Sequence, residues 1–514
     1  MIVQDQTSVL AFLKDSASYG ESVARVTTLD THISVIVFVG QRVFKLKRAV
    51  HLPYVDFSTA ARRLAACRQE LDLNRRTAPT LYVGVRCITR EADGRLLFDG
   101  HGELVDAVVE MVRFDENTLF DRMATRGQLT SALLTELSRT VARFHTNAAI
   151  DHRRTGAASI ASVLDSNEQA LAEANIFTSA TIAALTAKLR TALGHHEALL
   201  NARERASKVR HCHGDMHLRN ICLVNDVPTL FDCIEFDEAV ATIDILYDLA
   251  FLIMDLWHRG LESGANLVFN RYVDERDEVD GLPLLPFFMA IRAAVRAHVI
   301  AMQAGQATGQ RYEELVREAR AYIALAFRFL APAPPRLVAI GGLSGTGKST
   351  VAAAVANQLG PAPGARILAS DRIRKHLRGV PAEVRLPVAA YHPEVSEQIY
   401  AVLMQSVRAT LANGHAVVAD AVFAEIAYRE RVEQIALDAE VPFTGLWLHA
   451  QPDTLIARVD ARRGDASDAT VDVVRTQLAS QNSPAGWTWI EAGGTVTSTV
   501  ARVVEVLACR APQR

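Results

Sequence analysis

The 514-residue sequence lacks several features that mark special classes of protein. Its six cysteines form no C-x-x-C pair and show no zinc-ligand spacing. The first residues carry no basic segment followed by an apolar core, so no signal peptide is predicted. The apolar run 245–257 is interrupted by Asp248 and Asp255 and is too short to span a bilayer. We therefore expect a cytoplasmic protein with reduced cysteines and no membrane association.

An excess of charge is also missing. The formal net charge is −3, with 22% charged and 49% hydrophobic residues, and only 6% of the residues are aromatic. A chain of this kind has no bulk affinity for nucleic acid or for an anionic membrane. Arginine supplies most of the positive charge and lysine is scarce. Lys45 and Lys348, each at a motif position, are therefore stronger candidates for functional residues than they would be in a lysine-rich chain.

The length predicts two or three domains, and the pattern of the chain suggests where they divide. Residues 331–335, Ala-Pro-Ala-Pro-Pro, suit neither a helix nor a central strand and form the clearest linker. The first predicted domain, 1–330, has a β-rich lobe over about 1–112, with one helix at 58–76 starting from Ser58, and a mostly helical lobe over about 113–330. The second, 336–514, alternates strands and helices. We thus expect a two-lobed α+β domain followed by an α/β domain with a doubly wound parallel sheet.

A phosphate-binding loop opens the second predicted domain. The apolar strand 337–341 runs into G-x-x-x-x-G-K-[ST], followed by a helical pattern from residue 348. The glycines let successive backbone N–H groups point at phosphates, Lys348 reaches the β/γ-phosphates, and the hydroxyl of Ser349 ligates Mg²⁺. The residues expected to hold the nucleotide are Gly342, Ser344, Gly345, Thr346, Gly347, Lys348, Ser349 and Thr350.

Two carboxylates follow strands of the same predicted sheet. Asp420 ends the run 417–419 and is expected to hold the Mg²⁺ shell, directly or through water. Asp371 follows the strand 366–369 and is placed to accept a proton from an attacking hydroxyl; a helix N-cap is the alternative. Arg458 and Arg462 lie four residues apart on a predicted helix before the loop 464–468. They are either lid arginines that neutralise the transferring phosphoryl group or a solvated helix face.

The run Ser-Asp-Arg-Ile-Arg at 370–374 resembles P-loop kinases of the polynucleotide-kinase and zeta-toxin type. The resemblance covers about residues 336–510. It implies that Asp371 is the general base and that Arg374 handles substrate or phosphate.

A second phosphotransfer signature lies in the first domain. Residues 213–220 read H-G-D-x-H-x-x-N, and a predicted hairpin then returns Asp232 beside them. An aspartate that orients a hydroxyl, with Asn220 and Asp232 to hold Mg²⁺, is what phosphoryl transfer requires.

This signature resembles the aminoglycoside phosphotransferase family, a branch of the protein-kinase-like fold, over about residues 20–330. The resemblance implies that Asp215 is the catalytic aspartate, that Asn220 and Asp232 are metal ligands, and that Lys45 contacts the α/β-phosphates with Glu70 as its helix partner. It places Glu110 and Met111 at a hinge near adenine and makes 247–250 a structural segment. No G-x-G-x-x-G is present; residues 28–34 occupy its position.

Together the two halves resemble bacterial bifunctional proteins in which an aminoglycoside-phosphotransferase-like domain precedes a P-loop kinase domain. The leading hypothesis is an ATP-dependent kinase, with GTP as the alternative nucleotide, that uses Mg²⁺ and phosphorylates a hydroxylated small molecule. Two other hypotheses stay open: a kinase of nucleic-acid 5′-hydroxyls, against which the near-neutral charge argues, and an ATP-binding regulatory module with one inactive domain. The acceptor, the oligomeric state and any communication between the sites are not determined by the sequence.

Overall fold

The computed structural model describes residues 3–20, 25–52, 55–153, 156–462, 466–479 and 486–509. The chain divides into two compact units, residues 1–163 with 193–255 and residues 164–192 with 256–514. The predicted linker 331–335 lies between helix α11 (Gly309–Phe329) and strand β13 (Leu337–Gly342). Because the compact units divide elsewhere, the domain limits 1–330 and 336–514 stay a prediction.

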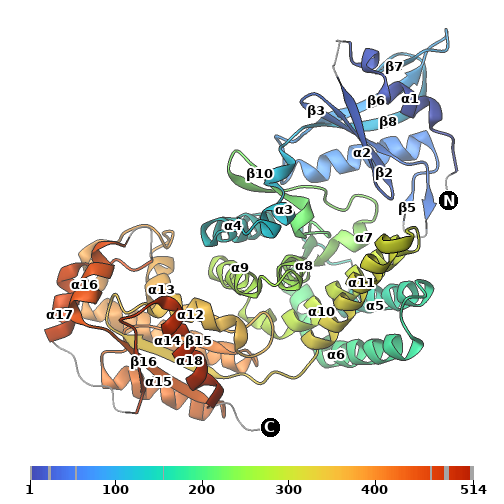
Figure 1. Ribbon diagram of the computed structural model, residues 1–514. Helices are drawn as coiled ribbons and strands as arrows, with labels where there is room; N and C mark the ends of the chain where they lie inside the picture. Colours follow the sequence, from blue (N-terminus) through green and yellow to red (C-terminus); the bar gives the residue numbers. More distant parts are fainter. Residues whose placement is uncertain are drawn as a thin grey trace. The chain divides into compact units, whose positions relative to one another are not determined.

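The first unit begins with an antiparallel sheet in the order β1-β2-β3-β8-β6-β7, drawn in blue in Figure 1. Helix α2 (Ala60–Asn74) packs against β8 and β6. Its N-cap is Thr59, whose hydroxyl accepts a hydrogen bond from Arg62 N at 3.3 Å, so the prediction of Ser58 at this position was wrong by one residue. The other elements of this lobe are α1 (Thr7–Lys14), β1 (Val26–Asp30), β2 (Ser34–Val39), β3 (Arg42–Lys47), β4 (His51–Leu52), β5 (Val55–Asp56), β6 (Tyr82–Arg90), β7 (Leu96–Phe98) and β8 (Glu103–Val112).

The rest of the first unit is mainly helical and carries two small antiparallel pairs, β10–β11 and β9–β12. Asn225 and Asp226 connect β10 to β11 with φ of +50° and +63°, the left-handed turn that suits a tight hairpin. The elements from residue 113 to 258 are α3 (Phe120–Thr125), α4 (Ser131–Asn147), α5 (Gly156–Glu173), α6 (Ser179–Arg205), β9 (Val209–His211), β10 (Ile221–Val224), β11 (Val227–Leu230), α7 (Glu238–Ala241), β12 (Thr242–Asp244) and α8 (Ile245–His258). Of these residues, 164–192 and 256–258, in α5, α6 and α8, belong to the second unit.

The second unit contains a five-stranded parallel sheet in the order β14-β15-β13-β16-β17 (Figure 1). Helices cover both of its faces: α12 and α18 pack on one side, and α14, α15 and α16 on the other. The sheet is therefore doubly wound, as predicted. Its elements are α12 (Lys348–Val355), β14 (Arg366–Ala369), α13 (Ser370–Leu377), α14 (Pro393–Ala412), β15 (Val417–Asp420), α15 (Ile426–Asp438), β16 (Phe443–His449), α16 (Pro452–Asp460), α17 (Val471–Ala479), β17 (Thr488–Glu491) and α18 (Val496–Cys509).

Three further helices precede this sheet in the second unit: α9 (Glu262–Glu275), α10 (Leu285–Ala304) and α11. Among the described residues, one helical segment, Val279–Ala304, is long and apolar enough to cross a membrane by length and composition, and 72% of its apolar window is buried inside the fold. All six cysteines are free, and five of them are buried or partly buried.

Candidate active sites

Strand β3 and helix α2 place a lysine beside a glutamate. Lys45 Nζ lies 2.8 Å from Glu70 Oε1, and the side chain of Glu70 is fully buried. Lys45 Nζ also lies 2.5 Å from Asp232 Oδ1. Burial lowers the pKa of Lys45, but the negative charges of Asp232 and Glu70 outweigh it, so this pKa is raised well above its usual value. The predicted lysine–glutamate contact is therefore present, and the lysine is charged.

Residues 213–220 form a tight loop that a buried carboxylate from helix α8 fixes in place. Asp248 accepts hydrogen bonds from the backbone N–H groups of His213 and Gly214, each at 3.0 Å. On the loop itself, Asn220 Nδ2 donates to the carboxylate and the backbone oxygen of Asp215, both at 2.9 Å. The side chain of Asp215 is 36% exposed, so its carboxylate can still meet a substrate.

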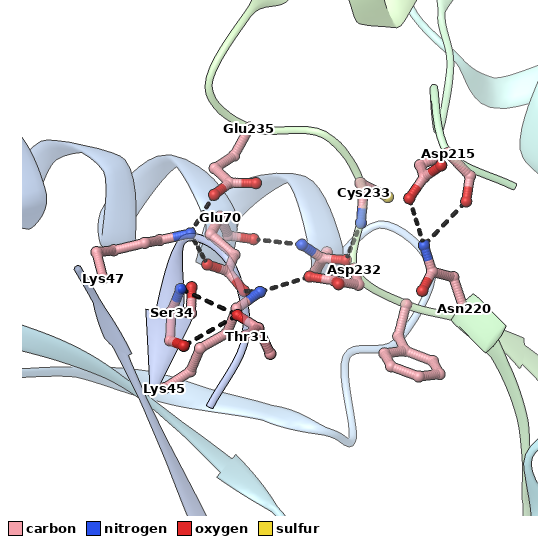
Figure 2. A network of polar contacts seen from close by, with 12 residues as sticks. Thr31, Ser34, Lys45, Lys47, Glu70, Asp215, Asn220, Asp232, Cys233 and Glu235 are labelled. Carbon is pink, nitrogen blue, oxygen red and sulfur yellow. Dashed lines mark hydrogen bonds and ion pairs between the residues drawn. The ribbon is translucent and has the colours of Figure 1, made fainter. Parts of the chain in front are cut away.

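Asp232 follows strand β11 and returns to the same loop. Its φ of +62° is left-handed, a conformation that aspartate tolerates better than most residues. Phe231 N donates to Asn220 O and Ile234 N donates to His213 O, both at 3.0 Å, so the chain on either side of Asp232 is bonded to the loop. Figure 2 shows Asp232 turned toward Lys45 and Asn220 turned toward Asp215. Carboxylate and amide oxygens are donors that Mg²⁺ prefers, so this donor set fits the metal.

A second lysine, which the sequence prediction missed, belongs to the same network. Lys47 is fully buried and pairs with both Glu70 and Glu235. Asp232, Lys45, Glu70, Lys47 and Glu235 thus form a row of alternating charge (Figure 2). Burial raises the pKa of Glu235, and the neighbouring Glu70 adds to the effect although Lys47 opposes it. The signal was present in the sequence, because residues i and i+2 of a strand lie on one face.

A short turn stands where a glycine-rich loop would cover the phosphates. Strand β1 ends at Asp30 and β2 begins at Ser34, so only residues 31–33 connect them. Thr31 Oγ1 donates to Ser34 O at 2.9 Å, and Ser34 N donates to Thr31 Oγ1 at 3.0 Å (Figure 2). Residues 31–33 contain no glycine, in agreement with the missing G-x-G-x-x-G.

Glu110 and Met111 lie near the end of β8, where the hinge was predicted. The carboxylate of Glu110 pairs with Arg42 and Arg86 and is nearly buried. Met111 is buried and lies opposite Val43 of β3. Their contact with an adenine stays a prediction.

The phosphate-binding loop has the backbone that its glycines predict. Gly342, Gly345 and Gly347 have φ of +137°, +87° and +89°. Lys348 Nζ donates to Leu343 O at 3.0 Å, and the backbone N–H of Ser344 donates to Gln477 Oε1 of helix α17 at 2.9 Å. Thr346 is buried, with its hydroxyl donating to Leu343 O at 2.8 Å, and Thr350 lies on the exposed side of helix α12.

Ser349 and Asp420 meet at the carboxyl end of the sheet. Asp420 is the last residue of β15, beside Ile340 of β13, and Ser349 Oγ donates to Asp420 Oδ2 at 2.6 Å. A hydroxyl and a carboxylate at this separation can share a hard cation, so these residues fit Mg²⁺.

Asp371 lies in the first turn of α13, directly after β14. The N-cap of this helix is Ala369, so the alternative of Asp371 as the cap was wrong. Burial raises the pKa of Asp371, although a hydrogen bond from Ser467 and the positive charge of Lys348 act in the opposite direction. The effect of Lys348 on this pKa indicates that Asp371 lies near the phosphate-binding loop.

The buried side chains that surround α13 order the segments next to Asp371. Arg374 donates to Ala390 O at 2.6 Å, and its guanidinium carbon lies 4.7 Å from the ring centroid of Tyr391. Asp468 accepts from Lys375 at 2.8 Å and from the hydroxyl of Tyr391 at 2.5 Å. Sequence reasoning assigned the loop 464–468 to a lid rim but missed Asp468 as its anchor; residues 464 and 465 lie outside the described residues.

The two predicted lid arginines do not share a helix face. Helix α16 ends at Asp460, so Arg462 lies beyond it, and the prediction of both arginines on one helix was wrong. Arg458 Nη1 donates to Ala492 O at 2.8 Å and Nη2 donates to Gly494 O at 2.9 Å, so its guanidinium binds backbone carbonyls. Phosphoryl contacts of Arg458 and Arg462 stay predictions.

Comparison with known proteins gives two separate matches along the chain. Residues 41–282 match the sequence model of the phosphotransferase enzyme family, and residues 337–484 match that of an AAA domain. Uncharacterised proteins of Mycobacterium tuberculosis and Mycobacterium bovis are 28% identical over 463 residues, which is 88% of this chain and 89% of theirs.

Solved structures with partial similarity include two kinases. A gluconokinase from Sinorhizobium meliloti is 21% identical, with 35% of this chain and 99% of that chain covered, at a TM-score of 0.25. A choline kinase from Cryptosporidium parvum is 10% identical, with 62% of this chain and 93% of that chain covered, at a TM-score of 0.40. Residues 41–282 thus resemble the phosphotransferase enzyme family and residues 337–484 an AAA domain with a P-loop, and the chain is a two-domain, kinase-type ATP-dependent phosphotransferase.

Proposed function

We propose that this protein transfers the γ-phosphoryl group of ATP to hydroxyl groups of small molecules, with a separate Mg²⁺-ATP site in each domain. One observation supports the proposal most: each site brings together a lysine, a pair of oxygen donors suited to Mg²⁺, and an aspartate that can receive a proton. The lysines are Lys45 and Lys348, and the aspartates are Asp215 and Asp371.

In the first site, Asp215 orients the acceptor hydroxyl and accepts its proton, while Asn220 keeps that carboxylate aligned through the 2.9 Å hydrogen bond. Lys45, released from Asp232, binds the phosphates, and Glu70 holds its ammonium group in place. Bound Mg²⁺ neutralises the charge that develops on the phosphoryl oxygens.

In the second site, backbone N–H groups of 342–350 and Lys348 bind the phosphates, and Ser349 with Asp420 holds the metal. Asp371 accepts the proton of the acceptor hydroxyl, and its raised pKa makes it a stronger base than an exposed aspartate. Arg374 binds Ala390 O and the ring of Tyr391, and this fixed segment would limit the size of the acceptor that reaches Asp371. A net charge of −3 favours small acceptors over nucleic acids.

The test uses γ-labelled ATP with pooled hydroxylated metabolites and, separately, a 5′-hydroxyl oligonucleotide. Asp215→Asn and Asp371→Asn are expected each to abolish a different metabolite transfer, whereas the exposed Asp226→Asn and Asp438→Asn leave both intact. Equal transfer by wild type and Asp215→Asn would make the first domain a binding module. Labelling of the oligonucleotide alone would identify a nucleic-acid kinase instead.

A further inference from the structure

Helix α9 carries a stripe of polar side chains that face the P-loop sheet. Asn266, Asn270 and Asp274 are spaced by four residues and therefore lie on one face of the helix. The two asparagines are almost completely buried, at 1% and 0% exposure. Buried amides require hydrogen-bond partners, and here the partners outside helix α9 lie in and around strand β14.

The asparagines complete the hydrogen bonding of an edge strand. Strand β14 is the first strand of the sheet, so one side of its backbone has no neighbouring strand. Asn270 Oδ1 accepts from Ile367 N at 2.7 Å, and its Nδ2 donates to Ala365 O at 3.2 Å. Asn266 Nδ2 donates to Pro363 O at 3.0 Å and to Ala365 O at 3.1 Å. The side-chain amides thus bind the outer edge of the sheet at Ile367 and at the residues that lead into β14.

Asp274 continues the stripe to helix α13. Its carboxylate lies 2.6 Å from Arg366 at the start of β14, 2.7 Å from Arg372 of α13, and 2.6 Å from Arg271 of its own helix. Burial acts to raise the pKa of Asp274, but the three arginines lower it well below its usual value, so the carboxylate is charged. The carboxylate of Asp274 therefore binds both the start of β14 and the first turn of α13.

These two attachment points lie on either side of Asp371 in the chain. Residues 366 and 372 bracket the strand end and the helix start that present the base, and Arg372 is its direct neighbour. Helix α9 lies within residues 41–282, the region that matches the phosphotransferase family, whereas β14 and α13 lie within the AAA match. A segment of one sequence family thus supports the base-bearing segment of the other.

We propose that Asp274, with the asparagine stripe of α9, is a positioning residue for phosphoryl transfer by the P-loop domain, acting through Arg366 and Arg372 on Asp371. This inference rests on the proposed role of Asp371. A base displaced by about 1 Å costs on the order of 10²-fold in rate, so a lost attachment point is measurable as activity.

The test compares Asp274→Asn with Glu275→Gln, an exposed carboxylate next to it on the same helix, in the full-length chain. We expect Asp274→Asn to lower kcat of the Asp371-dependent transfer by about 10- to 100-fold with KM for ATP within about twofold. The Asp215-dependent transfer is expected to stay unchanged and serves as an internal control. The kcat of the double variant Asp274→Asn/Arg372→Met is expected to be no lower than that of its less active single variant, because both changes remove the same ion pair.

A second measurement does not depend on turnover. Amide hydrogen exchange of residues 366–377 is expected to be faster in Asp274→Asn than in wild type, with exchange in helix α12 unchanged. Unchanged exchange at 366–377, or an equal loss of both transfers with a lower melting temperature, would overturn the inference. If the wild type shows no Asp371-dependent transfer, the proposed function fails and the positioning role fails with it, whereas loss of the inference alone leaves that transfer intact in Asp274→Asn.

Discussion

The row of alternating charges in the first unit predicts a large effect for Lys47→Met. Lys47 is fully buried between Glu70 and Glu235, whose side chains are 0% and 5% exposed. Methionine keeps the length of the side chain but removes its charge. Glu235 then loses its partner inside the protein, and Glu70 keeps Lys45 alone.

The size of the effect follows from the burial of the pair. Removing one partner of a buried ion pair costs about 3–5 kcal/mol, because the remaining charge is left without compensation. For a unit of this size, 1 kcal/mol corresponds to about 2–4 °C in melting temperature, so the transition of the first unit is expected to fall by about 6–20 °C. The exposed Lys14→Met in the same unit is the matched control and is expected to change little.

The assay must report on the first unit alone. All four tryptophans, Trp257, Trp447, Trp487 and Trp489, lie in the second unit, so intrinsic fluorescence does not follow the change. Scanning calorimetry resolves the transitions, and amide exchange in 42–47 and 60–74 locates the loss.

A compensating variant makes the reasoning refutable. Lys47→Met/Glu235→Met replaces the pair by apolar side chains and is expected to recover at least half of the lost stability, because no unpaired charge remains. Equal melting temperatures for wild type and Lys47→Met would show that the charge of Lys47 does not stabilise the first unit. A double variant less stable than Lys47→Met would refute the pairing of Lys47 with Glu235.

Two further predictions concern the P-loop domain. Gly342→Ala is expected to abolish nucleotide binding there, because a Cβ at this residue, with its φ of +137°, would lie 2.4 Å from Leu448 O. A Cβ at Gly347 would meet nothing within 4 Å, so Gly347→Ala is expected to weaken nucleotide binding less. Nucleotide titration compares the two variants, and equal affinities would contradict the steric argument. The rate of the Asp371-dependent transfer is expected to decline as the pH falls through the pKa of Asp371, which burial raises above the usual 3.8. The same raised pKa means that this carboxyl lowers folding stability as the pH rises through it. A pH–rate profile that stays flat down to pH 4 would rule out the raised pKa.

The elements that the sequence predicted well are those with a strong local signal. The strand 366–369 has the observed bounds of β14, and the glycines of the phosphate-binding loop adopt the expected left-handed backbone. Asp420 could be placed because its position at a strand end follows from parallel-sheet geometry. The contact of Asn220 with Asp215 follows in the same way from their spacing on one loop.

What the sequence did not predict depends on contacts between distant segments. Lys47 looks like a second strand lysine until Glu235, 188 residues further on, is found beside it. Helix α9 was not predicted at all, and the partners of Asn270 and Asp274 on β14 lie more than ninety residues away. Spacing within a helix shows which residues share a face, but it does not identify what that face meets.

The asparagine cover on β14 also bears on how the protein can be divided. A strand with open N–H and C=O groups is a template on which other chains can add, and aggregation follows. Cleavage within the proline-rich segment 331–335 would separate α9 from the sheet and uncover that template. The carboxyl-terminal fragment is therefore expected to self-associate, whereas a fragment that begins before residue 262 keeps its edge closed.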